Sequence, residues 1–80
     1  MKLVHFKQLS GYLFMLTFQN GKITKTDLMD LINCHVKANE LDTARINSEW
    51  GCLEFKGGMV DIEPKTLYNY ATTEDKLTLV

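Results

Sequence analysis

The sequence predicts an α+β fold in which a small, mostly antiparallel sheet packs with two or three short helices. Three observations lead to this prediction. The first 26 residues show the alternation and the turn signals of a three-stranded meander. Residues 27–36 then change to helical periodicity. Residues 45–62 contain short apolar runs separated by glycines, as expected of further short strands.

The first two predicted strands cover residues 2–9 and residues 12–19. In the first strand, Val4 and Phe6 share a side, so this strand should bury one face. The second strand carries apolar residues on both faces, with Phe14 on one and Met15 on the other. Such a strand is typically covered on both sides, which predicts a central position in the sheet.

The dipeptide Asn20-Gly21 is the strongest local signal in the chain. A type I′ turn needs positive φ at both central residues, which asparagine tolerates and glycine accepts freely. A two-residue turn of this type pairs Phe18 with Ile23 in the hairpin. The same register places Leu16 opposite Lys25.

Two helices are predicted from local signals. Thr26 is suited to be the N-cap of a helix that runs from Asp27 to about Val36, and residues 40–44 favour one further helical turn. The last helix should begin at Pro64. The fixed φ of proline is helical, and an N–H group at the first position of a helix would have no partner within the helix, so proline loses nothing by lacking it.

The composition is that of an ordinary globular domain. The chain has 80 residues, of which 45% are hydrophobic and 24% are charged, which is enough for one domain but not for two. We expect residues 1–71 to form a single α+β domain and residues 72–80 to form a C-terminal tail. The longest apolar run, residues 12–16, is too short to cross a membrane, and no signal-peptide core follows Met1. The predicted location is therefore the cytoplasm.

Charge is distributed unevenly along the chain. Residues 1–26 contain four lysines and no acidic residue, whereas residues 27–80 contain all ten acidic residues and five basic ones. Charge complementarity within one small fold explains this pattern without any function. The alternative, which concerns function, is a basic sheet face that attracts an acidic partner; the first explanation is favoured, because four lysines over 26 residues make a thin patch.

No group of residues has the spacing that catalysis or metal binding requires. Cys34 and His35 are neighbours, which on a helix turns their side chains about 100° apart. Cys34 and Cys52 are expected to be reduced and largely buried. Asp61 is expected to cap backbone N–H groups at the start of the last helix. The sequence thus predicts a protein that is not an enzyme, with no catalytic residue, no cofactor and no metal.

The candidate interaction surface consists of exposed basic and aromatic residues. We assign Lys22, Lys25, Trp50 and Lys56 to it. Trp50 follows a predicted strand at a turn, where a large aromatic side chain is a good contact residue. Tyr12, Tyr68 and Tyr70 are further candidates for stacking on bases, but small cores also use tyrosine for bulk.

The chain also resembles a known family over about residues 1–70. The resemblance rests on residues 16–21, on residues 51–58 and above all on the pattern Asp-Ile-Glu-Pro-Lys-Thr-Leu-Tyr at residues 61–68. These segments are similar to the domain-of-unknown-function family numbered 2442. The resemblance implies a small bacterial α+β protein, in some members fused to a helix-turn-helix and in others encoded beside a small protein in a toxin–antitoxin-like arrangement. It implies no catalytic or ligand residues.

These observations lead to two expectations about function. The first is a non-enzymatic interaction or regulatory module, antitoxin-like, that binds a small protein partner or a second copy of itself through a sheet edge or a basic face. The alternative is an accessory domain of a transcription regulator that contributes to nucleic-acid binding. Four lysines over 26 residues make a thin patch for nucleic acid, so the first expectation is favoured.

Overall fold

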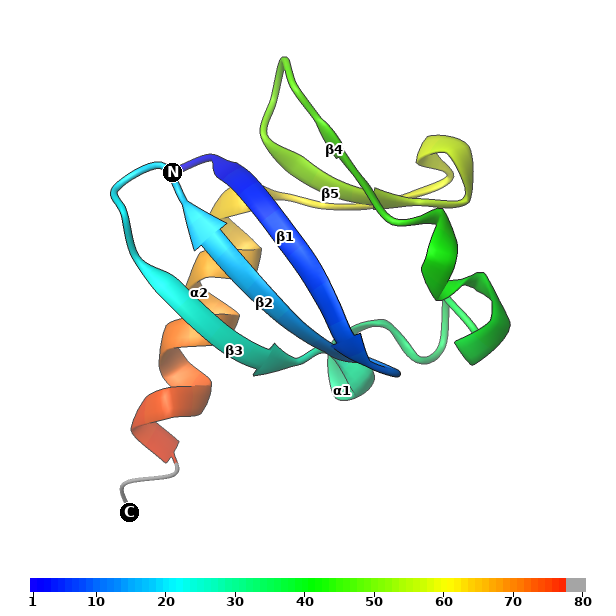
Figure 1. The fold of residues 1–80 in the computed structure, drawn as a ribbon, viewed down its shortest axis with the longest axis horizontal. Helices are drawn as coiled ribbons and strands as arrows, with labels where there is room; N and C mark the ends of the chain where they lie inside the picture. The colour runs from blue at the N-terminus through cyan, green and yellow to red at the C-terminus, as the bar shows by residue number, and fades with distance from the viewer. Residues whose placement is uncertain (78–80) are drawn as a thin grey trace.

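The computed structural model describes residues 1–77, and the side chains of residues 1–73. It confirms the α+β class, but the strands form two three-stranded antiparallel sheets instead of one: sheet A in the order β1-β2-β3 and sheet B in the order β4-β5-β6 (Figure 1). The elements along the chain are β1 (Leu3–Ser10), β2 (Leu13–Phe18), β3 (Ile23–Asp27), α1 (Met29–Ile32), the 3-10 helix η1 (Ala38–Thr43), β4 (Arg45–Asn47), β5 (Cys52–Phe55), the 3-10 turn η2 (Lys56–Gly58), β6 (Val60–Ile62) and α2 (Pro64–Leu77).

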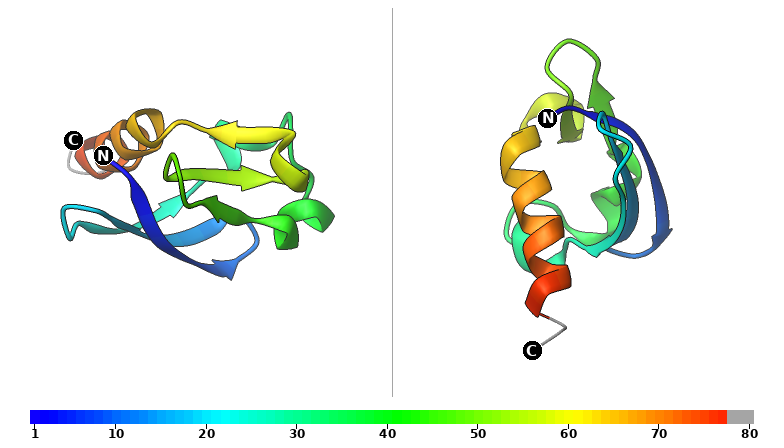
Figure 2. Two further views of the ribbon diagram at one scale, coloured as in Figure 1. Left: turned by 90° about the horizontal axis from the view of Figure 1, so that it is seen from above. Right: turned by 90° about the vertical axis from the view of Figure 1, so that its left-hand side faces the viewer.

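One continuous core joins the two sheets and α2. The helix α2 lies against the inner face of sheet A, and sheet B lies beyond the β1 edge with β4 nearest to β1 (Figure 2). The ring of Phe14 meets the ring of Phe55 edge-on at 6.2 Å, and Phe18 meets Tyr68 edge-on at 5.0 Å. The fully or nearly fully buried apolar residues are Leu3, Phe14, Leu16, Phe18, Leu28, Ile32, Val36, Leu41, Leu53, Phe55, Ile62, Leu67 and Ala71.

The start of β1 connects sheet A to sheet B through the backbone. The N–H of Gln19 donates to the carbonyl of Lys2 (2.8 Å), and the N–H of Leu3 donates to the carbonyl of Gly51 (3.1 Å). Residues 2 and 3 therefore lie between the β2 end and the turn that joins β4 to β5. Gly51 has a positive φ of 73° and is packed against Lys2.

The predicted register of the β2–β3 hairpin is wrong by one residue. Thr17 pairs with Ile23, so Lys25 lies opposite Met15 instead of Leu16. The N–H of Gly21 bonds to the carbonyl of Phe18, and only Gly21 has positive φ in this loop, as in a three-residue loop that ends in a glycine bulge. The physical reason is burial: the predicted register would have placed Lys25 on the core face beside the buried Leu16.

The strands β1 and β2 also differ in part from the prediction. The pairing of β1 with β2 is interrupted after Leu3 and after Gln8, so Val4 stands in a bulge and is 54% exposed, whereas Phe6 packs against the core. The strand β2 is central, as predicted, but only one of its faces is fully buried. Met15 on the other face remains half-buried.

The first helix is much shorter than predicted. Thr26 is not its N-cap but the buried penultimate residue of β3, where its hydroxyl bonds to that of Thr24 at 2.9 Å. Instead, Asp27 Oδ1 accepts a hydrogen bond from the N–H of Met29, and α1 makes a single turn. The extra turn predicted for residues 40–44 is present as the 3-10 helix η1.

The last helix begins at Pro64, as predicted, and continues past residue 71 as far as Leu77. Residues 72–77 of the expected tail therefore belong to α2. Our expectation for residues 78–80 lies outside the described residues. Among residues 1–77, no helix is both long enough and apolar enough to span a membrane.

Candidate functional site

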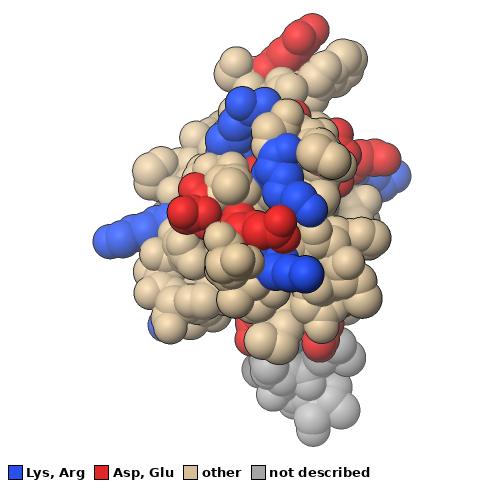
Figure 3. Space-filling view, turned by 90° about the vertical axis from the view of Figure 1, so that its right-hand side faces the viewer, with Lys and Arg blue, Asp and Glu red and all other residues tan. Residues whose placement is uncertain are grey.

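The four residues of the candidate surface fall in three separate places. Lys56 lies at the η1 and η2 end of the molecule, where acidic and basic side chains alternate (Figure 3). Its Nζ lies 3.5 Å from Glu40 Oε2, and its N–H donates to Thr43 Oγ1 at 2.9 Å. Lys56 also has a positive φ of 58°. These contacts hold the β5–η2 turn against η1, so Lys56 lies apart from Lys22 and Lys25 and also apart from Trp50.

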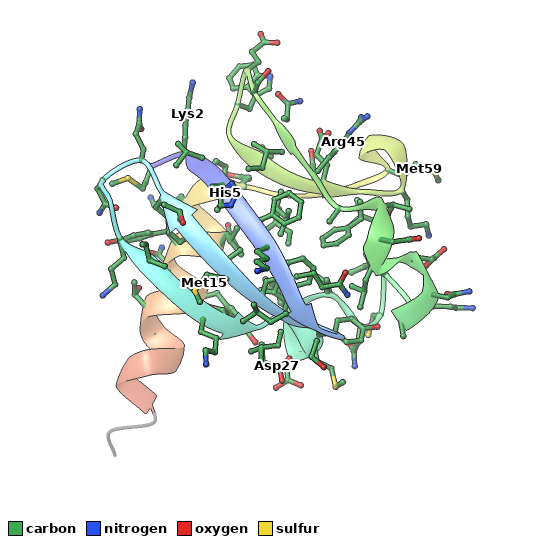
Figure 4. All side chains as sticks on the ribbon, viewed as in Figure 1. Lys2, His5, Met15, Asp27, Arg45 and Met59 are labelled. Carbon is green, nitrogen blue, oxygen red and sulfur yellow. The ribbon has the colours of Figure 1, made fainter. Side chains whose placement is uncertain are left out.

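Lys22 and Lys25 lie together at the outer face of sheet A. Figure 4 looks onto this face and labels Met15 and His5 on it. Residues directly opposite each other in an antiparallel sheet share a face, so the register places Lys7, Met15 and Lys25 in one row. Lys22 is exposed at the adjoining hairpin end, with its N–H bonded to Asn20 Oδ1.

We call this surface the lysine face. Within the described chain, no helix or strand covers it, and α2 packs on the opposite side of the sheet (Figure 2). The row next to that of Met15 contains Ile23, whose side chain is 60% exposed. The lysine face consists of His5, Lys7, Ser10, Leu13, Met15, Thr17, Ile23, Lys25 and Asp27, and Lys22 adjoins it at the hairpin end.

Trp50 lies elsewhere, in the turn between β4 and β5, and is 65% exposed. Asn47 shapes this turn, because its Oδ1 accepts hydrogen bonds from the N–H groups of Glu49 (3.0 Å) and Trp50 (3.1 Å). The Asn47 amide also donates to Glu54 Oε2 at 3.2 Å. Sequence reasoning missed Asn47; the signal available to it was an asparagine three residues before an exposed tryptophan and followed by Gly51.

Glu54 is the buried charge of sheet B. Its carboxylate accepts a hydrogen bond from Asn47 and another from Arg45 Nε at 3.0 Å. The Asn47 hydrogen bond, followed by that from Arg45, lowers the pKa of Glu54 below its ordinary value. Glu54 therefore stays ionised and joins β4 to β5 through side chains as well as through the backbone.

A pocket of about 380 Å³ lies on the outer face of sheet B beside Trp50. We call it the acidic pocket, because three of its residues are Glu54, Asp61 and Glu63. Asp61 and Glu63 are exposed, and neither carboxylate bonds to a described residue, so the expectation that Asp61 caps α2 is wrong. The pocket is lined by Asn47, Trp50, Cys52, Glu54, Asp61, Glu63 and Pro64.

The cysteines are free but not largely buried, which corrects our expectation. Cys34 is exposed, because α1 ends at Ile32 and leaves Cys34 in the turn that follows. Cys52 is half-buried, and burial together with the charges of Asp61 and Glu54 raises the pKa of its thiol. A raised pKa keeps this thiol protonated, whereas a nucleophilic cysteine needs the opposite. No group of three His, Cys, Asp or Glu among the described residues is placed to hold a metal ion.

The tyrosines considered for base stacking make structural contacts. The Tyr12 hydroxyl donates to the carbonyl of Val36 at 2.6 Å, and the Tyr70 hydroxyl donates to that of Asp27 at 3.1 Å. Tyr68 packs on Phe18 in the core. Of the four aromatic candidates, Trp50 alone is more than half exposed, and it lies among carboxylates.

A scan against protein-family models gave no match for this chain, and searches of curated proteins and of solved structures gave none either. The resemblance to the family numbered 2442 therefore stays a prediction.

Proposed function

We propose that this protein is a regulatory interaction module, antitoxin-like, whose lysine face binds an acidic surface of a small protein partner. The observation that supports the proposal is the row Lys7–Met15–Lys25 on the uncovered side of sheet A. The row places an apolar side chain between two cations. The proposal places the protein in the cytoplasm, a reducing compartment that suits its two free cysteines.

The lysine face combines a short-range and a long-range attraction. Burying Ile23, with the half-exposed Met15 beside it, removes apolar surface from water, at roughly 25 cal/mol for each Å². Lys7 and Lys25 attract an acidic partner from a distance and raise the rate of encounter more than the final affinity. The acidic member of the face, Asp27, lies at its edge opposite Leu13 and accepts a hydrogen bond from the N–H of Met29, so with Lys7 and Lys25 the face keeps a net positive charge.

Nucleic-acid binding remains the alternative, because a face with a net positive charge also suits phosphate. The lysine face contains no phenylalanine, tyrosine or tryptophan on which a base could stack, and His5 is its single aromatic ring. The exposed Trp50 does not supply one, because Asp61 and Glu63 line the pocket beside it and repel phosphate. Both points favour a protein partner.

The test uses two charge-reversal variants of the tagged protein. Lys7→Glu/Lys25→Glu reverses the lysine face, and Lys65→Glu is the matched control on the exposed side of α2. Each protein is used to capture partners from its own cells, and a captured protein is then purified and titrated. We expect one small acidic protein in stoichiometric amount with the wild type and with the control, and at least tenfold weaker binding by the double variant.

Two outcomes would contradict the proposal. One is equal binding of the partner by the double variant and the wild type. The other is binding to duplex DNA or RNA that is steeply weakened by salt and lost in the double variant, which would establish the nucleic-acid alternative.

A further inference from the structure

The strand β6 (Val60–Ile62) forms an open edge of sheet B. It pairs with β5 on one side, and no other described strand pairs with it. An edge strand offers backbone N–H and C=O groups to another extended chain. Pro64 follows it closely, which also suits an edge position.

A hollow lies on each side of this edge. The first is the acidic pocket beside Trp50, of about 380 Å³. The second, of about 280 Å³, separates β6 from α1 and is lined by Leu31, Ile32, Val60 and other residues. Asp61 and Glu63 contribute atoms to both hollows. The open edge thus runs between two spaces of side-chain size.

This arrangement matches the side-chain pattern of an added strand. Successive residues of an extended chain point to opposite faces of a sheet. A strand paired with β6 would direct every second side chain toward the acidic pocket and the others toward the second hollow. Recognition by strand addition uses such pockets for specificity, while backbone hydrogen bonds supply affinity.

The chemistry of the two hollows selects different side chains. In the acidic pocket, Arg45 already neutralises Glu54, so Asp61 and Glu63 carry the charge that remains. A guanidinium group can bond to a carboxylate through two N–H groups and can also stack on the indole of Trp50, whose side chain is 65% exposed. The second hollow is lined by Leu31, Ile32, Val60 and Ile62 on its apolar part, which suits an apolar side chain, and by His35, Asp61, Glu63 and Thr66 on the remainder.

The same charges disfavour pairing between two copies of the protein. Antiparallel pairing of β6 with β6 of a second copy would bring two pairs of Asp61 and Glu63 carboxylates together across the new edge. Like charges opposite each other destabilise a sheet. Charge complementarity therefore identifies a basic segment as the occupant.

We propose that the β6 edge binds an extended segment of a partner protein in which arginine alternates with apolar residues, with arginine in the acidic pocket and the apolar side chains in the second hollow. This surface is separate from the lysine face and attracts the opposite charge. It goes beyond the function proposed above, and either can fail without the other.

The probe is the peptide acetyl-Thr-Val-Arg-Val-Arg-Val-Thr-amide, titrated at low ionic strength. Trp50 is the only tryptophan in the chain, so its fluorescence reports directly on the acidic pocket. We expect a saturable change in Trp50 emission and slower hydrogen exchange of backbone amides in β6. A peptide with glutamine in place of arginine should bind at least tenfold more weakly.

Protein variants then separate the pocket from general charge attraction. Asp61→Asn should weaken binding about tenfold. Glu49→Gln, which removes an exposed carboxylate outside the pocket, should change it less than twofold. The Asp61 side chain is exposed and its carboxylate bonds to no described residue, so Asp61→Asn should keep the wild-type thermal midpoint, which is measured alongside. Lys7→Glu/Lys25→Glu should bind the peptide at least as well as the wild type.

A third peptide tests the strand pairing itself. It carries N-methyl groups on two adjacent central residues, which removes N–H donors from both of its edges, and we expect binding to be lost. Equal binding of this peptide, or equal binding by wild type and Asp61→Asn, would overturn the proposal. So would the absence of any binding by the unmodified peptide.

Discussion

Sheet A and sheet B are both three-stranded antiparallel meanders, but different interactions hold them in shape. Sheet A has strands of five to eight residues, and the core-facing residues of its central strand are fully buried. Sheet B has strands of three or four residues, and it relies on the contacts of Glu54 with Arg45 and Asn47. Apolar alternation thus specifies the first sheet, and a polar network with a glycine turn specifies the second. Their outer faces also carry opposite charges.

The largest expected effect tests whether the two sheets unfold together. Phe14→Ala removes the ring that contacts Phe55 across the sheets and should cost about 3–5 kcal/mol of unfolding free energy. Met15→Ala, the next residue on the outer face, should cost about 1 kcal/mol or less. Urea unfolding followed by circular dichroism and by Trp50 fluorescence should give coincident transitions in both variants. Separate transitions would show that the sheets are independent units.

The next effect concerns the turn that joins sheet B to β1. In Gly51→Ala, the new Cβ would lie 2.9 Å from the backbone Cα of Lys2 and would also require positive φ. Together these should cost about 3 kcal/mol. Gly57→Ala has a similar φ of +69° but meets no atom within 4 Å, so it should cost about 1 kcal/mol. Thermal unfolding of both variants measures the difference, and equal midpoints would contradict the close packing at Lys2.

A smaller effect should appear when the pH is lowered. The folded pKa of Glu54 lies below its ordinary value of 4.5, so the unfolded chain takes up the proton first and acidification destabilises the fold. The stabilisation that the ionised Glu54 carboxylate gives to the fold is fully present above pH 4.5, and it is lost as the pH falls through the lowered pKa. Glu54→Gln should therefore show a flatter dependence of its thermal midpoint on pH in this range. Glu49→Gln is the control and should keep the wild-type slope.

The smallest effect leaves stability unchanged and compares the two thiols. Cys34 is exposed, whereas Cys52 is half-buried and its pKa is raised by burial and by nearby carboxylates. Because the thiolate is the reacting form, iodoacetamide at neutral pH should modify Cys34 at least tenfold faster than Cys52. Peptide mapping by mass spectrometry measures both rates in one sample. Equal rates in the folded protein would contradict the placement of Cys52.

The difference between the two sheets also explains which strands and which register could be predicted from the sequence. Alternation identified β1, an apolar run identified β2 as the central strand, and the Asn20-Gly21 turn signal identified β3. The hairpin register failed because Asn20-Gly21 suits both a two-residue turn and a three-residue loop with a glycine bulge. Requiring Lys25 to avoid the core would have selected the observed register.

The candidate site was less predictable than the fold. The exposure of Trp50 and the place of Lys25 on a basic face could be predicted, because both follow from residues that are close to them in the sequence. The acidic pocket depends on β5 and β6 lying next to each other and on the turn held by Asn47, which are tertiary facts. Sequence reasoning assigns Lys56 to the interaction surface although it pairs with Glu40, because the two lie 16 positions apart in the chain and this spacing does not predict the ion pair.

The junction at Lys2 has a consequence for the order of folding. The hairpins of both sheets join residues close together in sequence, whereas the bond from Leu3 to Gly51 and the contact of Phe14 with Phe55 close loops that include most of the chain. Long loops lose more conformational entropy on closure than hairpins do. We therefore expect the local hairpins to form early and the first residues of β1 to dock between them late. Variants at Gly51 should then change the unfolding rate more than the folding rate.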